Sequence, residues 1–343
     1  MKHNRLSFIP TAVLTAGALI ASSAVKAEDL PQIKTRKQLS VTRGFAGTSL
    51  PVLQRAGALD QNQVSASLIE KFRPGSEQQS TQIGGTLRTT GEQWSLEVSS
   101  DGFGAEYHDL AVQARAHALG RPVSQQMPAA ELEQKGRAFI ASQLASQIAL
   151  GANEQLIALR ADYRTEGGED LNTGQTTSAV VASRIVFGRT IGGVPVVGNG
   201  SKVIITFTND GALESFRYDW PKYEAGAPQN VVGPAEVLTR LQKVMAVRNG
   251  ANPGNPAVAV PGRGPNAYPV ALSSNTQLQS LDCGYYDSGS KGRGIHSVQP
   301  GCTYLTVSQD TNGMRQGFAG AVPAGTTFAV NAAWMETRIL GQQ

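Results

Sequence analysis

The stretch that decides the fold runs from Ser178 to Trp220 and reads SAVVASRIVFGRTIGGVPVVGNGSKVIITFTNDGALESFRYDW. Apolar and polar residues alternate along much of it, which is typical of strands that bury one face. The apolar residues that share a face in the two clearest strands are Val181, Ile185, Phe187, Val203, Ile205 and Phe207. The stretch therefore predicts three or four antiparallel strands.

Glycines mark the turns between these strands. Gly192 and Gly193 are suited to the positive φ of a tight reversal. Gly198 and Gly200 favour a second turn or bulge, and Asn209-Asp210-Gly211 favours a third turn. A glycine-rich turn can also present backbone groups to a partner. The candidate binding turn consists of Gly192, Gly193, Pro195 and Gly198.

A family resemblance rests on the run from Ile185 to Phe216. This run combines an apolar strand, Gly193-Val194-Pro195-Val196, a second apolar strand and Asp210-Gly211. It resembles the FTP and PepSY modules in propeptides of thermolysin-like metallopeptidases, over about residues 128–250. The resemblance implies a non-catalytic module that inhibits or chaperones a secreted peptidase. The peptidase itself is not in this sequence, which contains no HExxH zinc motif.

Residues 1–27 have the features of a secretory signal peptide. Lys2 and Arg5 precede an apolar run from Leu6 to Ala24, and small or apolar residues lead to a cleavage point after Ala27. We therefore expect a secreted or periplasmic protein with no transmembrane anchor after cleavage.

Charge argues against nucleic acid as a partner. Removing the signal peptide takes away three of the 30 basic residues and none of the 26 acidic ones, which leaves a net charge of +1. A nearly neutral protein has no general electrostatic attraction for a polyanion.

Two helices are expected around the central strands. The first runs from Met127 to Leu150, with Leu132, Ile140 and Leu144 in an apolar stripe, and the second from Pro234 to Arg248. The expected fold class is α+β: an antiparallel sheet backed by two helices, with a small C-terminal all-β unit.

Composition divides the chain into five parts. The expected boundaries are a signal peptide at 1–27, an irregular and β-hairpin region at 28–120, an α+β PepSY/FTP-like domain at 121–250, a Pro/Gly-rich linker at 251–269 and a C-terminal β domain at 270–343. In the second part, Asp101-Gly102 predicts a hairpin turn, and Trp94, Phe103 and Tyr107 are expected to be packing residues.

The chain has two cysteines, Cys283 and Cys302. In an oxidising compartment they are expected to form one disulfide. A metal site that adds His296 is the alternative, but it lacks the paired short spacing of zinc ligands. We therefore expect the disulfide, and no metal or other cofactor.

Catalytic motifs are sparse. There is no GxSxG, and Glu166, Glu169 and Asp170 are acidic neighbours that match no calcium loop, so a solvated acidic turn is expected there. The main hypothesis is a secreted non-catalytic binding protein whose partner is a secreted peptidase or another exported protein. The alternatives are a hydrolase that uses these carboxylates and a structural protein of the cell envelope.

Overall fold

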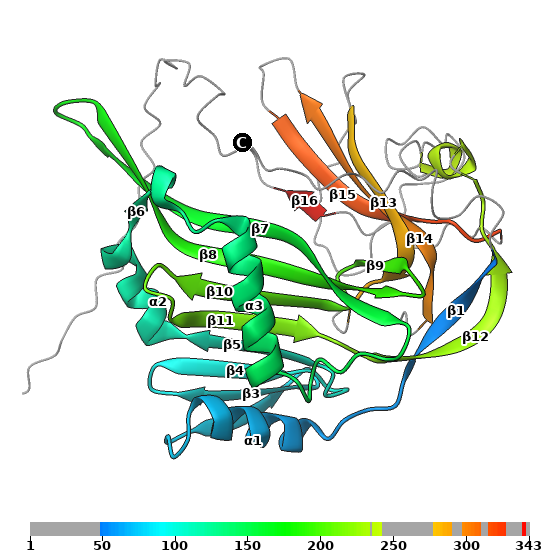
Figure 1. The fold of residues 1–343 in the computed structure, drawn as a ribbon, viewed down its shortest axis with the longest axis horizontal. Coiled ribbons are helices and arrows are strands. Elements are labelled where there is room, and N and C mark those ends of the chain that lie inside the picture. The colour runs from blue at the N-terminus through cyan, green and yellow to red at the C-terminus, as the bar shows by residue number, and fades with distance from the viewer. Residues whose placement is uncertain are drawn as a thin grey trace, which may run out of the picture. The chain divides into compact units, whose positions relative to one another are not determined.

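The structure is a computed structural model that describes residues 49–233, 235–241, 277–289, 297–309, 315–326 and 338–340. Most of these residues lie in strands (Figure 1). The expected signal peptide, the expected linker and His296 lie outside the described residues.

Two consecutive segments contain the same order of elements. The first has α1 (Gln61–Phe72), β2 (Gln79–Ile83), β3 (Thr86–Gly91), β4 (Trp94–Val98) and β5 (Gly104–Asp109). The second has α3 (Ala129–Gln143), β7 (Glu154–Asp170), β8 (Gln175–Ile191), β10 (Lys202–Thr208) and β11 (Leu213–Asp219), with β9 (Val194–Gly198) inserted. Between the segments lie α2 (Leu110–Ala116), η1 (His117–Leu119), β6 (Arg121–Pro122) and η2 (Val123–Gln125).

The two segments join through their last strands. β5 pairs antiparallel with β11, so the strands run in the order β7, β8, β10, β11, β5, β4, β3, β2. Each segment thus has its final strand at the centre and its first strand at an outer edge. This arrangement is that of one motif repeated about an approximate two-fold axis.

The hairpin turns of the two segments match in detail. They comprise residues 99–103 and 208–212. In each, the aspartate (Asp101 or Asp210) accepts a hydrogen bond from the N–H two residues later, at 3.0 Å and 3.2 Å respectively. Each aspartate also accepts a bond from the hydroxyl two residues earlier. The following glycines, Gly102 and Gly211, have φ of +70° and +88°, which glycine adopts without steric cost.

One face of these eight strands carries the first hydrophobic core. Leu68 of α1 and Leu132 of α3 are buried in it, together with the apolar side chains that alternate along the strands. Gly136 lets α3 approach closely, because a Cβ there would lie 2.7 Å from the Phe187 ring. Trp94, Phe103 and Tyr107 are buried and so serve packing.

The remaining strands extend the same hydrogen-bonded network. They are β1 (Ser49–Ala56), β12 (Lys222–Asn230), β13 (Gln277–Asp287), β14 (Ser297–Gln309), β15 (Arg315–Pro323) and β16 (Arg338–Leu340). β13 pairs in parallel with β9, and β14 pairs with β1. A second core lies here, and it includes Val237 and Leu241 from helical residues 235–241.

The expected fold class was wrong. The described chain is mostly β, in one large mixed sheet with a few short helices. The expected second helix does not back the central strands, because Val237 and Leu241 pack in the second core. The C-terminal strands are not a separate β unit either, since β9 and β13 pair directly. The expected first helix ends at Gln143 rather than Leu150. The domain boundaries remain predictions.

Candidate functional site

The candidate binding turn divides into two parts with different surroundings. Gly192 and Gly193 form the β8–β9 turn, with φ of +56° and +79° and open space around them. Pro195 and Gly198 instead lie against β13. A Cβ at Gly198 would lie 2.3 Å from the Asp287 carbonyl oxygen, so this glycine serves the pairing of β9 with β13. A role of this turn in binding stays a prediction.

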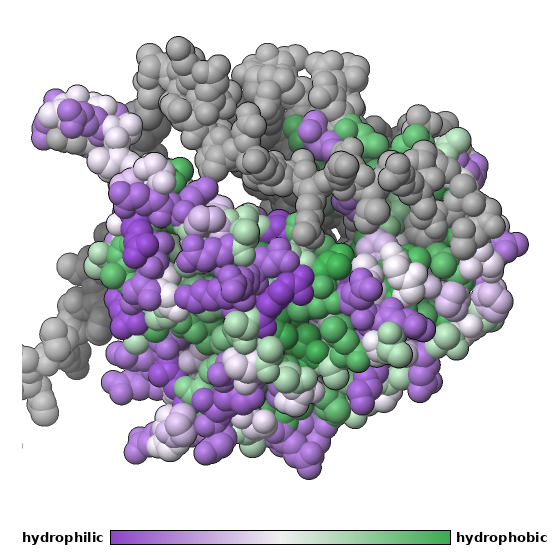
Figure 2. All heavy atoms as spheres, in the orientation of Figure 1, coloured by the Kyte–Doolittle hydropathy of each residue, from purple (hydrophilic) through white to green (hydrophobic). Residues whose placement is uncertain are grey.

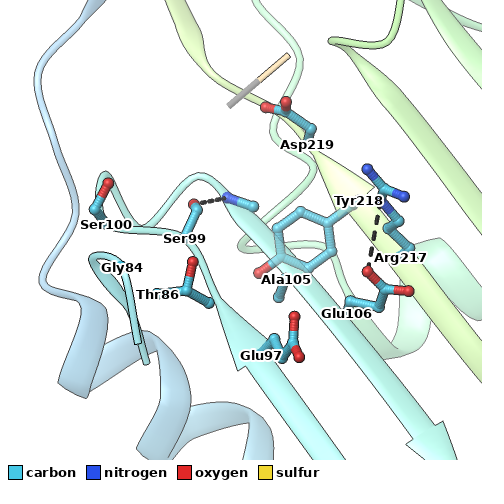
Figure 3. A pocket seen from close by; sticks show the side chains of 11 residues that line it. Gly84, Thr86, Glu97, Ser99, Ser100, Ala105, Glu106, Arg217, Tyr218 and Asp219 are labelled. Carbon is cyan, nitrogen blue, oxygen red and sulfur yellow. Dashed lines mark hydrogen bonds and ion pairs between the residues drawn. The ribbon is translucent and has the colours of Figure 1, made fainter. Parts of the chain in front are cut away.

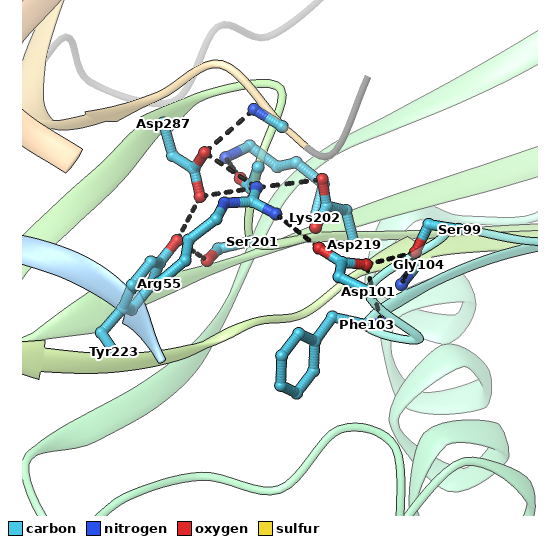
Figure 4. Close-up of polar contacts among 12 residues, drawn as sticks. Arg55, Ser99, Asp101, Phe103, Gly104, Ser201, Lys202, Asp219, Tyr223 and Asp287 are labelled. Atoms are coloured by element: carbon cyan, nitrogen blue, oxygen red, sulfur yellow. Dashed lines mark hydrogen bonds and ion pairs between the residues drawn. The ribbon is translucent and has the colours of Figure 1, made fainter. Parts of the chain in front are cut away.

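A buried ionic cluster lies where β1, β11 and β13 meet (Figure 4). Nη2 of Arg55 lies 2.9 Å from Oδ1 of Asp287 and 3.2 Å from Oδ2 of Asp219, and Nη1 lies 3.5 Å from Asp101. The Arg55 side chain is 10% exposed and that of Asp287 is 1% exposed. Gly200 makes room for this arrangement, because a Cβ there would lie 2.1 Å from the Asp287 carboxyl carbon.

Burial and charge shift the titration of this cluster. Burial lowers the pKa of Lys202 to about 8, although Asp287 and Asp219 oppose the shift. The Lys202 amine donates to the carbonyls of Val196 and Gly200, each at 2.9 Å. Burial, reinforced by Asp287, raises the pKa of Tyr223 well above its ordinary value, and its hydroxyl donates to Asp287. Tyr223 is therefore neutral across the physiological pH range.

Arg189 adds a further buried cation beside this cluster. Its guanidinium lies 4.1 Å from the centroid of the Trp220 ring and 5.0 Å from that of Tyr223, so two aromatic faces hold it. Its Nη1 donates to Glu154 at 3.0 Å. Its Nε and Nη2 find no hydrogen-bond partner in the part of the chain that the structure describes.

The chemistry of the cluster favours a structural role. Its cations and carboxylates are close to balance. The ion pairs of Arg55 with Asp219 and Asp287 link strands that are far apart in the sequence. Removing one partner of a buried ion pair leaves an uncompensated charge, which lowers the free energy of unfolding by about 3–5 kcal/mol. The cluster therefore couples the central strands to the C-terminal ones.

A small pocket lies beside the cluster (Figure 3). Its volume is about 260 Å³, and Glu97, Glu106, Arg217 and Asp219 are among its lining residues. Ligand sites in proteins are usually larger and mostly apolar. Nε of Arg217 lies 3.9 Å from Glu106, a pairing expected on a solvated sheet face. The pocket does not indicate a small-molecule ligand.

The acidic residues considered for a hydrolase lie on an exposed ribbon. Glu166 and Glu169 belong to β7, where β7 and β8 project together beyond the rest of the sheet (Figure 1). The projecting end is mostly hydrophilic at its surface (Figure 2), although Leu171 at its tip is 90% exposed. Glu166 bonds His117, and the side chains of both residues are exposed.

The predicted disulfide is confirmed. Cys283 and Cys302 are joined, and they face each other across β13 and β14. Both belong to the second core. Among the described residues, no three histidine, cysteine, aspartate or glutamate side chains gather as metal ligands would. The same residues include no helix with the length and apolar character needed to span a membrane.

The free edge of β2 is a feature that sequence reasoning missed. In the described part of the chain β2 pairs only with β3, and all five of its residues are exposed. It contains no charged residue and no proline, and its register is regular. Sheet edges usually carry charges, prolines or bulges that prevent pairing with another chain. The sequence signal was the uncharged run QSTQI, which is easily read as a loop.

The backbone groups that β2 leaves free can be assigned from its turn. Gly84 and Gly85 have φ of +56° and +84°, a two-residue turn in which Ile83 and Thr86 bond each other. Bonding then alternates along an antiparallel pair, so Thr81 faces β3. Ser80 and Gln82 therefore direct their N–H and C=O groups outward.

The other outer strand is protected. β7 carries seven charged residues among its 17, and its register shifts at 158–160 and again at 164–165. Charges and bulges of this kind block pairing with a further strand. β2 is therefore the outer strand of the repeated sheet that remains open to an extended chain.

Comparison with known proteins does not assign the chain to a family. No family model matches this chain, and no curated protein matches it.

Proposed function

We propose that this is an exported, non-catalytic protein that binds a polypeptide by adding it as a strand to β2. The observation that carries the proposal is the uncharged, regular and exposed edge of β2, with the backbone groups of Ser80 and Gln82 directed outward. Strand addition draws its affinity from such main-chain hydrogen bonds.

Export is supported by two observations. Residues 1–27 read as a signal peptide, and Cys283 and Cys302 form the kind of bond that persists in oxidising compartments. Secretion or periplasmic residence is part of the proposal. The resemblance of residues 185–216 to propeptide modules favours a secreted peptidase as partner, with inhibition or chaperoning as the outcome.

A proline at Ser80 tests the proposal. Ser80→Pro removes an outward N–H while leaving the bonds between β2 and β3, because proline is tolerated on edge strands. Ser80→Ala is the matched control, since it loses only the hydroxyl contact with Thr89 at 2.9 Å. An array of immobilised nine-residue peptides should bind wild type and Ser80→Ala, and Ser80→Pro should bind at least tenfold more weakly, about 1.4 kcal/mol.

Circular dichroism and thermal unfolding would establish that Ser80→Pro keeps its fold. Equal peptide binding by Ser80→Pro and wild type would show that β2 is not the binding site. If wild type binds no peptide on the array, the proposed function is wrong.

A further inference from the structure

We propose that the strand accepted by β2 runs antiparallel to it and carries the order apolar residue, any residue, acidic residue. This rests on the proposed function and names the class of partner. The side chains that flank the free edge differ along its length. Ile83, at one end of β2, is 59% exposed. Arg88 lies on the neighbouring strand β3, where it pairs with Thr81.

The apolar position follows from Ile83. Residues 79, 81 and 83 alternate with residues 80 and 82, and Ile83 lies on the face away from the first core. A residue placed opposite Ile83 on an added strand has its Cβ about 4.5–5.5 Å away. An apolar side chain at this position covers the exposed isoleucine.

The acidic position follows from Arg88. Thr81 pairs with Arg88, so both side chains lie on the same face. The Arg88 side chain is 48% exposed, and its ion pair with Glu97 is long, at 3.9 Å. A residue opposite Thr81 lies two strand spacings from Arg88, roughly 10 Å between backbones. The two long side chains of an arginine and a glutamate span that distance.

The direction of the added strand sets the order of these two positions. Antiparallel pairs are slightly more stable per residue than parallel ones. In an antiparallel strand the residue opposite Ile83 comes first and the one opposite Thr81 comes two residues later. Glu77 precedes β2 and repels a second acidic residue beyond Gln79. The preferred strand is thus apolar at its first position and acidic at its third.

Fluorescently labelled nine-residue peptides test the inference. All three peptides have a threonine-rich sequence. The first peptide contains Val-Thr-Glu, the second contains Val-Thr-Lys, and the third contains the reverse order, Glu-Thr-Val. At low salt, wild type should bind the first about two- to fivefold more tightly than the second, and more tightly than the third. Arg88→Glu should invert the preference between glutamate and lysine.

Arg184→Glu is the matched control. Arg184 lies on β8 near the protected outer edge, where it pairs with Asp162 at 2.8 Å. This variant should keep the wild-type preference. If Arg88→Glu discriminates among the peptides as wild type does, the inference is wrong, and loss of binding in Ser80→Pro would still support strand addition. If none of the peptides binds wild type, both proposals are wrong.

Discussion

The segment from α1 to β5 and the segment from α3 to β11 share their order of elements and their Asp-Gly turns. Their outer strands differ. β2 has five uncharged residues in regular register, whereas β7 is long, charged and twice bulged. Because the two halves have the same plan, the protection of β7 shows what β2 lacks. An open edge is therefore a property of one copy of the motif, not of the motif itself.

The inner ends of the two segments differ as well. The turn with Asp101 and Gly102 lies at the ionic cluster, where Asp101 meets Arg55. The turn with Asp210 and Gly211 lies near α3, where Lys135 donates to the Gly211 carbonyl at 2.9 Å. The space beside Gly102 is limited by backbone atoms of Leu59, whereas the space beside Gly211 is limited only by the flexible side chain of Lys135. This difference can be measured.

The largest expected effect is at the first turn. Gly102→Ala adds a Cβ 2.5 Å from the Leu59 carbonyl oxygen at a φ of +70°, so it should lower the free energy of unfolding by about 3 kcal/mol. Gly211→Ala meets only the end of Lys135 and should cost about 1 kcal/mol. Urea unfolding of both variants measures the difference. Equal losses would contradict the contrast between the turns.

The next effect concerns Lys202 at the start of β10. The matching residue of the first segment is Gln93, just before β4. Burial lowers the pKa of Lys202 to about 8 in the folded protein, so above that pH the unfolded state binds more protons. Stability should therefore rise from pH 8 to 9.5, by on the order of 2 kcal/mol from this group.

Lys202→Met removes that rise. Chemical unfolding of wild type and variant at pH 7.5, 8.5 and 9.5 checks it. A variant whose stability changes with pH as wild type's does would show that Lys202 stays charged when folded.

The smallest effect separates two matched positions, His108 on β5 and Arg217 on β11, each six residues after the glycine of its turn. The hydrogen bond to Glu106 raises the pKa of His108. Its stabilisation is therefore complete below about pH 6.5 and is lost as pH rises through the raised folded value.

His108→Gln should abolish this pH dependence, with a loss at pH 5.5 of about 0.5 kcal/mol or less, because the side chain is 41% exposed. Arg217 also lies 3.9 Å from Glu106, so Arg217→Gln is compared in the His108→Gln background. Arginine stays charged, so in that background its effect should be the same at pH 5.5 and 7.5. Thermal unfolding at both pH values gives the comparison. A pH-dependent loss from Arg217→Gln in the His108→Gln background would contradict the assignment of the pH dependence to His108.

Local patterns predicted local structure well. The alternation from Ser178 to Trp220 corresponds to β8, β9, β10 and β11, and the turns at Gly192-Gly193 and Asp210-Gly211 are present. The disulfide followed from compartment and cysteine number. The repeat was missed although its signal is present: Leu96 and Ile205 each lie five residues before the turn aspartate.

Pairing between distant segments was not predictable in the same way. The parallel pairing of β9 with β13 and the meeting of Arg55 with Asp287 join residues 89 and 232 positions apart. Periodicity reports which face of an element is buried, but not against which element. The open edge of β2 was hidden for the same reason, since an edge is defined only once every neighbour is known.

The partners of β1 have a consequence for the order in which the chain assembles. β1 begins at Ser49, but it pairs with β12, which begins at Lys222, and with β14, which begins at Ser297. During synthesis β1 must remain unpaired until these later strands have been made. Closing such long loops slows folding, and native pairing at this point comes late. The first strand in the described part of the chain is therefore among the last to pair.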